Sequence, residues 1–104
     1  MSEAETLKFI YDRLKSSFDV KRMILFGSRA AGSAGPESDF DLLVIAETDI
    51  PFIQRQGMAL MALGKRDFPV DLLVYTSHEA ERAAETPGST VYWAFREGRD
   101  YDSG

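Results

Sequence analysis

Two aspartates and a Gly-Ser pair are the first residues of this chain whose types and spacing could do chemistry. Asp39 and Asp41 are separated by one residue and lead directly into an apolar run, while Gly27-Ser28 directly follows another apolar run. Carboxylate oxygens are the ligands that Mg²⁺ prefers, and a glycine lets a phosphate approach the backbone closely. The pattern predicts a divalent-metal site beside a phosphate-binding turn.

A repeated tetrapeptide suggests a third carboxylate for the same site. The sequence DLLV occurs at Asp41–Val44 and again at Asp71–Val74. If these two runs are parallel neighbouring strands, Asp41 and Asp71 emerge at the same end of the sheet. Three crowded carboxylates raise one another's pKa unless cations neutralise them, which favours a two-metal site. Each aspartate taken alone is also typical of a loop that enters a strand.

The elements that must position these residues alternate between strands and helices. The apolar periodicity predicts a leading helix over 2–18, with a stripe of Leu7, Ile10, Leu14 and Phe18. Short strands are predicted at 23–26, at 42–45 opened by the two aspartates, and at 70–75. The other predicted elements are a segment 29–31 capped by Ser28, a loop 32–38, a helix from Pro51 to Gly64, a helix from a Ser77 cap to Ala84, a helix 89–97, and a short polar tail that could form an edge strand. This order predicts a single small α/β domain over 1–104, with helices packed on a short mixed sheet.

The composition excludes several classes of function. The chain has 104 residues, and 12 Lys+Arg against 17 Asp+Glu give a formal net charge of −5, which disfavours nucleic acid as a partner. It has no cysteine, so it has no disulfide or thiolate zinc site. No apolar run reaches the length of a membrane span and the start lacks the pattern of a signal peptide. We therefore expect no membrane contact and a cytoplasmic location.

The spacing of the motif resembles a known signature. Gly27-Ser28, ten residues, and then Asp39-Phe40-Asp41 match the G-S-x10-D-x-D pattern of the DNA polymerase beta-like nucleotidyltransferase superfamily. The chain is most similar to its small branch, the minimal nucleotidyltransferase (MNT) proteins. The resemblance extends over nearly the whole chain, from the leading helix through LFGSR, SDFDLLV and PVDLLVY to the closing REGR.

The resemblance implies a role for each site residue. Gly27 and Ser28 would contact the triphosphate of ATP, and Arg29 is a further candidate for nucleotide binding. Asp39 and Asp41 would hold two Mg²⁺ ions, and Asp71 would help to hold one of them and activate the attacking hydroxyl. The family often has arginine where this chain has Ala31, and this departure weakens the expected contact with the triphosphate.

The resemblance also implies an activity and a partner. MNT proteins similar to this chain transfer AMP from ATP to a tyrosine hydroxyl of a HEPN-domain ribonuclease toxin and so act as its antitoxin. We expect the acceptor to come from another molecule, because 104 residues leave little room for a second substrate-binding domain. Two alternatives stay open: a catalytically weak binding module that neutralises its partner by complex formation, and a small-molecule nucleotidyltransferase.

The remaining candidates favour structural roles. His78, the only histidine, is expected at the surface. Tyr92 and Trp93 are expected to pack the last helix, and Met58 with Met61 are at helical spacing, which indicates core or partner-facing residues.

Overall fold

The computed structural model describes residues 1–35 and 38–102. Pro36 and Glu37, within the loop predicted over 32–38, and Ser103 and Gly104, at the end of the tail, lie outside the described residues. The described elements are, in chain order, α1 (Glu3–Leu14), β1 (Asp19–Phe26), α2 (Gly27–Ala31), β2 (Phe40–Glu47), α3 (Phe52–Leu63), β3 (Val70–Tyr75), α4 (Ser77–Ala84), α5 (Thr90–Glu97) and β4 (Arg99–Asp100).

The four strands form one mixed sheet in the order β3-β2-β1-β4. β1 is antiparallel to β2 and to β4, whereas β2 and β3 are parallel. The two DLLV runs are paired residue by residue, from Asp41 opposite Asp71 to Val44 opposite Val74. The structure confirms the α/β class, the mixed sheet and the parallel pairing that the repeat predicts.

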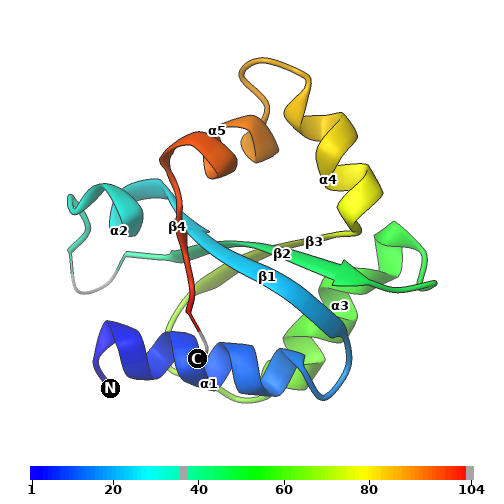
Figure 1. Ribbon diagram of the computed structural model, residues 1–104. Helices are drawn as coiled ribbons and strands as arrows, with labels where there is room; N and C mark the ends of the chain where they lie inside the picture. The colour runs from blue at the N-terminus through cyan, green and yellow to red at the C-terminus, as the bar shows by residue number, and fades with distance from the viewer. Residues whose placement is uncertain (36–37, 103–104) are drawn as a thin grey trace.

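Helices cover both faces of the sheet, so the central strand β2 is buried on two sides (Figure 1). Leu42 and Val44 face α1 and α3, whereas Leu43 and Ile45 face α4 and α5. Because side chains alternate along a strand, Asp41 belongs to the second face, with Leu43. The apolar residues of β2 thus pack into two hydrophobic cores, one on each face of the sheet. The Asp41 carboxylate lies on the face that α5 covers.

The helix boundaries correct two predictions. The leading helix ends at Leu14 rather than at residue 18, although Phe18 is still buried through a turn in which its N–H donates to the Leu14 carbonyl at 2.9 Å. α4 is capped by Thr76 rather than Ser77, because the Thr76 hydroxyl accepts from the Glu79 N–H while the Glu79 carboxylate accepts from the Thr76 N–H. Reciprocal bonds of this kind define a capping box.

The tail and the two methionines of α3 can also be compared with the sequence-based expectations. The tail is too short and polar for its pattern to decide its structure; its first two residues form the edge strand β4, which pairs with Ile24 and Leu25 of β1. Met61 is 82% exposed and Met58 lies near the surface, so neither is a core residue of the described structure. None of the helices in the described ranges is long and apolar enough to cross a membrane.

Arg55 of α3 is a buried cation that connects α3 with β3 and α4. It is only 5% exposed; its guanidinium donates to the Ile50 carbonyl at 2.8 Å and to the Val74 carbonyl at 3.3 Å, and forms an ion pair with Glu79 at 2.6 Å. The bond from Arg55 is the main reason that the pKa of Glu79 lies below its ordinary value.

We expect Arg55→Leu to lower the free energy of unfolding by about 2–3 kcal/mol. The change leaves the Val74 carbonyl without this donor and removes charge-assisted bonds, while the partly exposed Glu79 stays hydrated, which limits the loss. Urea denaturation measures the effect, with Arg82→Leu on the exposed side of α4 as the matched control. Equal stability of the two variants would contradict the role of Arg55.

Candidate active site

The Gly-Ser turn lies where β1 passes into α2. Gly27 has a φ of +74°, a conformation that favours glycine, and Ser28 is exposed on the first turn of α2. The residue that precedes this helix is Phe26 and no side chain caps it, so the prediction that Ser28 caps the segment is wrong.

Asp41 and Asp71 form one row with the end of β1. Asp41 is paired with Phe26 across β1 and with Asp71 across β3, so the Gly-Ser turn begins one residue beyond this row. Neighbouring strands are about 4.8 Å apart, which places the two carboxylates side by side on the same face. Asp41 is half-buried and Asp71 is exposed.

Gly27 lies directly against Asp41. A Cβ built on Gly27 would collide with the Asp41 Oδ2 and would lie 3.2 Å from its Cγ. The absence of a side chain at position 27 therefore creates the space that the Asp41 carboxylate occupies. The turn and the carboxylate row are in contact, although Gly27 and Asp41 are fourteen positions apart in the sequence.

Asp39 lies outside the strand that it was predicted to open. β2 begins at Phe40, whose N–H donates to the Pro69 carbonyl at 3.0 Å, and Asp39 is the exposed residue before it. Within residues 1–35 and 38–102, no three carboxylate, imidazole or thiol side chains are gathered closely enough to bind one metal ion together. The structure therefore pairs Asp41 with Asp71 and leaves Asp39 beside them.

The pKa of Asp41 reports how these carboxylates affect one another. It lies above its ordinary value, first because burial penalises the charged form and then because of the negative charges of Asp71 and Asp39. In the described part of the chain, no lysine or arginine forms an ion pair with any of the three. The row is thus an anionic site that the described side chains leave without a neutralising partner.

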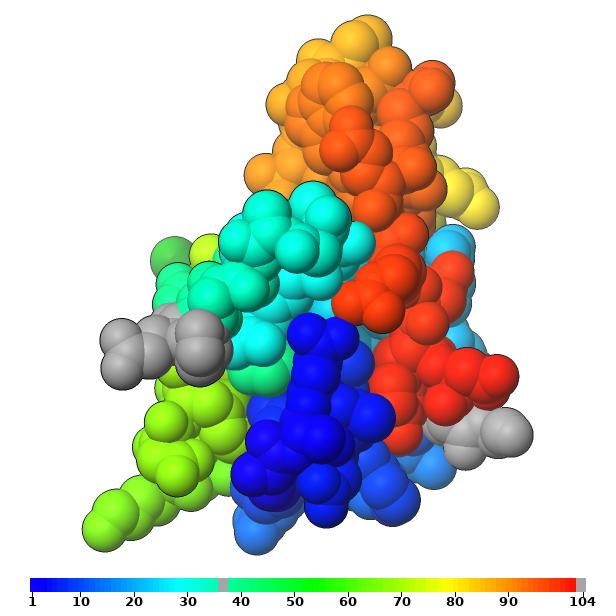
Figure 2. All heavy atoms as spheres, turned by 90° about the vertical axis from the view of Figure 1, so that its left-hand side faces the viewer, coloured from blue at the N-terminus to red at the C-terminus, as the bar shows by residue number. Residues whose placement is uncertain are grey.

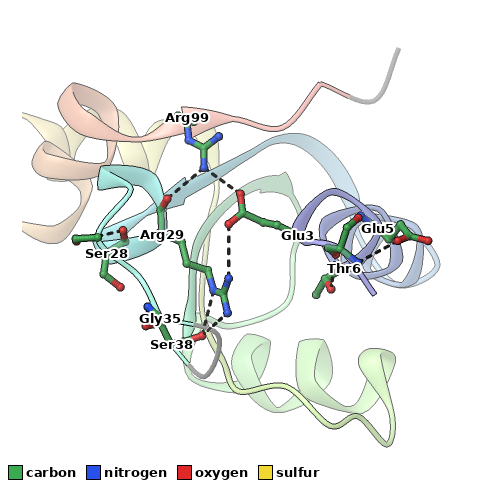
Figure 3. A network of polar contacts seen from close by, with 10 residues as sticks. Glu3, Glu5, Thr6, Ser28, Arg29, Gly35, Ser38 and Arg99 are labelled. Carbon is green, nitrogen blue, oxygen red and sulfur yellow. Dashed lines mark hydrogen bonds and ion pairs between the residues drawn. The ribbon is translucent and has the colours of Figure 1, made fainter.

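Arg29 has its guanidinium directed away from the row, into a network of polar contacts (Figure 3). It donates to the Ser38 carbonyl at 2.9 and 3.0 Å and lies 3.6 Å from Glu3, and it stacks 3.9 Å from the centre of the Phe40 ring. Arg99 donates both to Glu3 and to the Arg29 carbonyl. This network fixes α2 and the start of β2 to α1, so in this arrangement Arg29 is a support of the site.

A cleft of about 460 Å³ opens beside the Gly-Ser turn. Its lining residues are Phe26, Gly27, Ser28, Ala31, Ser33, Trp93 and Glu97. Trp93 is 48% exposed and lines this cleft, so the prediction that it packs the last helix is wrong, whereas Tyr92 beside it is half-buried. The helical period could have found this, because Val91 and Ala94 form the buried side of α5.

The other candidates lie away from the row. His78 is exposed on α4, as predicted. Two further tyrosines have aromatic neighbours elsewhere in the fold: Tyr75 contacts Phe52, and Tyr101 contacts Tyr11.

An α/β domain that holds a Gly-Ser turn against paired carboxylates has the layout expected of a nucleotidyl-transfer domain. The chain belongs to the nucleotidyltransferase domain family, whose sequence model matches residues 7–67. It is 36% identical over 55 residues to the putative protein adenylyltransferase MJ0604 of Methanocaldococcus jannaschii; the matched region is 51% of this chain and 55% of the relative. The chain thus spans about half the length of this curated relative.

Two solved toxin–antitoxin structures have a similar fold. A toxin–antitoxin structure with AMP-PNP aligns with a TM-score of 0.61 and 23% identity, over all of this chain and 75% of that one. A variant of the toxin–antitoxin pair MntA-HpeT aligns with the same score and coverage at 19% identity. These similarities establish a shared fold, and with the family match they confirm the class inferred from the motif.

Proposed function

We propose that this domain transfers AMP from ATP, with two Mg²⁺ ions, to a tyrosine hydroxyl of a HEPN-domain toxin, and that it acts as the antitoxin of that toxin. The observation that carries the proposal is the row formed by Asp41 and Asp71 against the Gly27-Ser28 turn. A turn for phosphate beside carboxylates for metal is the arrangement that nucleotidyl transfer needs.

The donor set fits divalent cations. Asp41 and Asp71 offer hard oxygen ligands side by side, Asp39 is adjacent, and the raised pKa of Asp41 marks a site where positive charge would be stabilising. These three residues would hold the two ions, which supply charge stabilisation at the attacking and leaving oxygens. No metal contact is needed from Gly27 or Ser28, which would bind the phosphates.

The reaction requires the chain to position an acceptor and to remove a proton. The acceptor oxygen bonds to the α-phosphorus of ATP, the bond from that phosphorus to the bridging oxygen breaks, and pyrophosphate leaves. The acceptor proton passes to the Asp71 carboxylate, the more exposed member of the row and therefore the one an incoming hydroxyl reaches. Asp41 is half-buried against Gly27 and would act as a metal ligand.

The choice of partner rests on the relatives. The structures that share this fold are toxin–antitoxin complexes, one of them with an ATP analogue, and the curated relative is named as a putative protein adenylyltransferase. They support a toxin as the acceptor and adenine as the base. The tyrosine and the HEPN class of toxin follow from the resemblance to MNT proteins.

Incubation with labelled ATP, Mg²⁺ and the co-encoded partner tests this function. We expect label on the partner, its loss when the acceptor tyrosine is replaced by phenylalanine, and its loss in the Asp39→Ala/Asp41→Ala variant. Removal of Mg²⁺ by a chelator should abolish labelling. Toxin neutralisation without any labelling, unchanged in the double variant, would overturn the proposal.

That last outcome would favour a second function, a module that silences its partner by binding alone. Two points favour this alternative: the resemblance to MNT proteins leads us to expect arginine where this chain has Ala31, and the Arg29 guanidinium contacts Ser38 and Glu3. The chain then has fewer cations near the turn than a strong triphosphate site needs. The carboxylate row favours the enzyme.

A further inference from the structure

The cleft beside the Gly-Ser turn extends beyond the residues that the proposed reaction uses, because only Gly27 and Ser28 of its lining have a part in that reaction. It lies between α2 and α5, which are in contact on the face shown in Figure 2, where α2 is cyan and α5 is orange to red. Gly27 belongs both to this cleft and to the wall of the carboxylate row, because it contacts Asp41. A ligand with its phosphates at the turn therefore has an adjoining space for its remaining part.

One wall of the cleft is a fixed aromatic ring. Trp93 is the only tryptophan of the chain and is 48% exposed. Tyr92 contacts its ring edge-to-face at 5.2 Å, and the Arg96 guanidinium lies 4.4 Å from the centre of the Tyr92 ring. A ring held by such neighbours offers a flat apolar surface with little rotational freedom to lose on binding.

The rest of the cleft combines small residues with one acid. Gly27, Ser28, Ala31 and Ser33 have short side chains, so they leave room opposite Trp93. Glu97 is four residues after Trp93 on α5 and shares its side of the helix. A carboxylate repels phosphate but accepts hydrogen bonds from an amino group, so the cleft suits an uncharged aromatic ring that carries a hydrogen-bond donor.

We propose that this cleft binds the nucleobase of the nucleotide, with Trp93 as the stacking surface and Glu97 as the acceptor for the exocyclic amino group of the base. The inference rests on the proposed function, because the phosphates of the same nucleotide must lie at Gly27-Ser28. It gives Ala31 a role: a long side chain at this position would fill the space that the base occupies.

Tryptophan fluorescence tests the inference directly, because Trp93 is the only source of that signal. We expect ATP with Mg²⁺ to quench the emission, and inorganic tripolyphosphate with Mg²⁺ to bind without comparable quenching. Purine riboside triphosphate, which lacks the amino group, should bind about tenfold more weakly than ATP. Glu97→Ala should remove that difference.

Substitutions separate stacking from general effects on the fold. Trp93→Ala should weaken ATP binding about tenfold, measured by calorimetry, while Trp93→Phe restores most of it. The matched control is Phe52→Ala, which removes another half-exposed aromatic side chain from a helix that does not line the cleft. Binding of tripolyphosphate should be equal in all three variants.

Ala31→Arg gives the strongest contrast. The cleft proposal predicts weaker binding of ATP and unchanged or stronger binding of tripolyphosphate, because the new side chain fills the base site and adds a cation near the turn. A gain in ATP affinity, with no change in the quenching, would overturn the proposal.

The outcomes also separate this inference from the proposed function. If AMP transfer proceeds and Trp93→Ala leaves the KM for ATP unchanged, the base lies elsewhere and the enzyme assignment stands. If the unmodified protein binds neither ATP nor tripolyphosphate with Mg²⁺, the inference and the proposed function are both overturned.

Discussion

Asp41→Asn is expected to reduce AMP transfer at least about 1,000-fold and to leave the fold no less stable. The activity falls because an amide oxygen carries no full negative charge and binds Mg²⁺ weakly, so the site would lose hold of a cation that offsets negative charge in the transition state. The fold is retained because Asn has the same shape against Gly27, and because Asp41 is a half-buried carboxylate beside two others. The variant thus separates the chemical role of this residue from any role in folding.

The pH dependence of stability gives an independent check on Asp41. Its pKa in the folded chain lies above the ordinary value of 3.8, so the folded state holds the proton more tightly than the unfolded state does. The stability that this group contributes is fully present below about pH 3.8 and is lost as the pH rises through the folded-state pKa. Asp41→Asn should therefore be at least as stable as the natural chain at pH 7, and this advantage should disappear as the pH approaches 3.8.

Mg²⁺ should reverse the order of stability. On the proposed function, Mg²⁺ binds the folded row, so thermal unfolding of the natural chain should shift upward with Mg²⁺ and ATP, whereas that of Asp41→Asn should not. The matched control is Asp49→Asn, which removes an exposed carboxylate ahead of α3 and should change neither transfer nor the shift. Full activity of Asp41→Asn would show that this carboxylate is not a metal ligand.

The carboxylate row could be predicted from the sequence, because two short segments define it. Asp41 and Asp71 each precede a strongly apolar tetrapeptide, and the repeated DLLV indicated two strands with the same direction and register. Strand alternation then places both carboxylates on one face. The local sequence pattern could not predict that β2 begins at Phe40. That boundary depends on a hydrogen bond to the carbonyl of Pro69, which is far along the chain.

The supports of the site were missed for the same reason. Arg29 is directed to Glu3, Ser38 and the Phe40 ring by contacts between separate elements. Arg55 is a buried cation in a helix that otherwise has an apolar pattern, and its burial depends on Glu79 and on strand carbonyls. The sequence shows only a charged side chain in each case, because the fold determines which residues that side chain contacts.

Gly27→Ala is expected to reduce AMP transfer about 100-fold or more. At a φ of +74° an alanine costs about 1–2 kcal/mol, and its Cβ would occupy the place of the Asp41 carboxylate. The carboxylate can rotate away, so most of the collision is relieved by displacing the side chain rather than by unfolding the domain. A displacement of about 1 Å in a metal ligand is enough for a loss of this size.

Gly32→Ala is the control that isolates the collision. Gly32 has almost the same φ, +76°, but among residues 1–35 and 38–102 a Cβ built there meets no non-neighbouring atom within 4 Å. Both variants should therefore lose a similar free energy of unfolding, about 1–2 kcal/mol, while only Gly27→Ala loses transfer and the Mg²⁺-dependent thermal shift. If both lose activity equally, backbone strain in the α2 turn is the cause and the contact between Gly27 and Asp41 is unimportant. If Gly27→Ala alone is inactive at matched stability, the glycine is required because it makes room for the carboxylate.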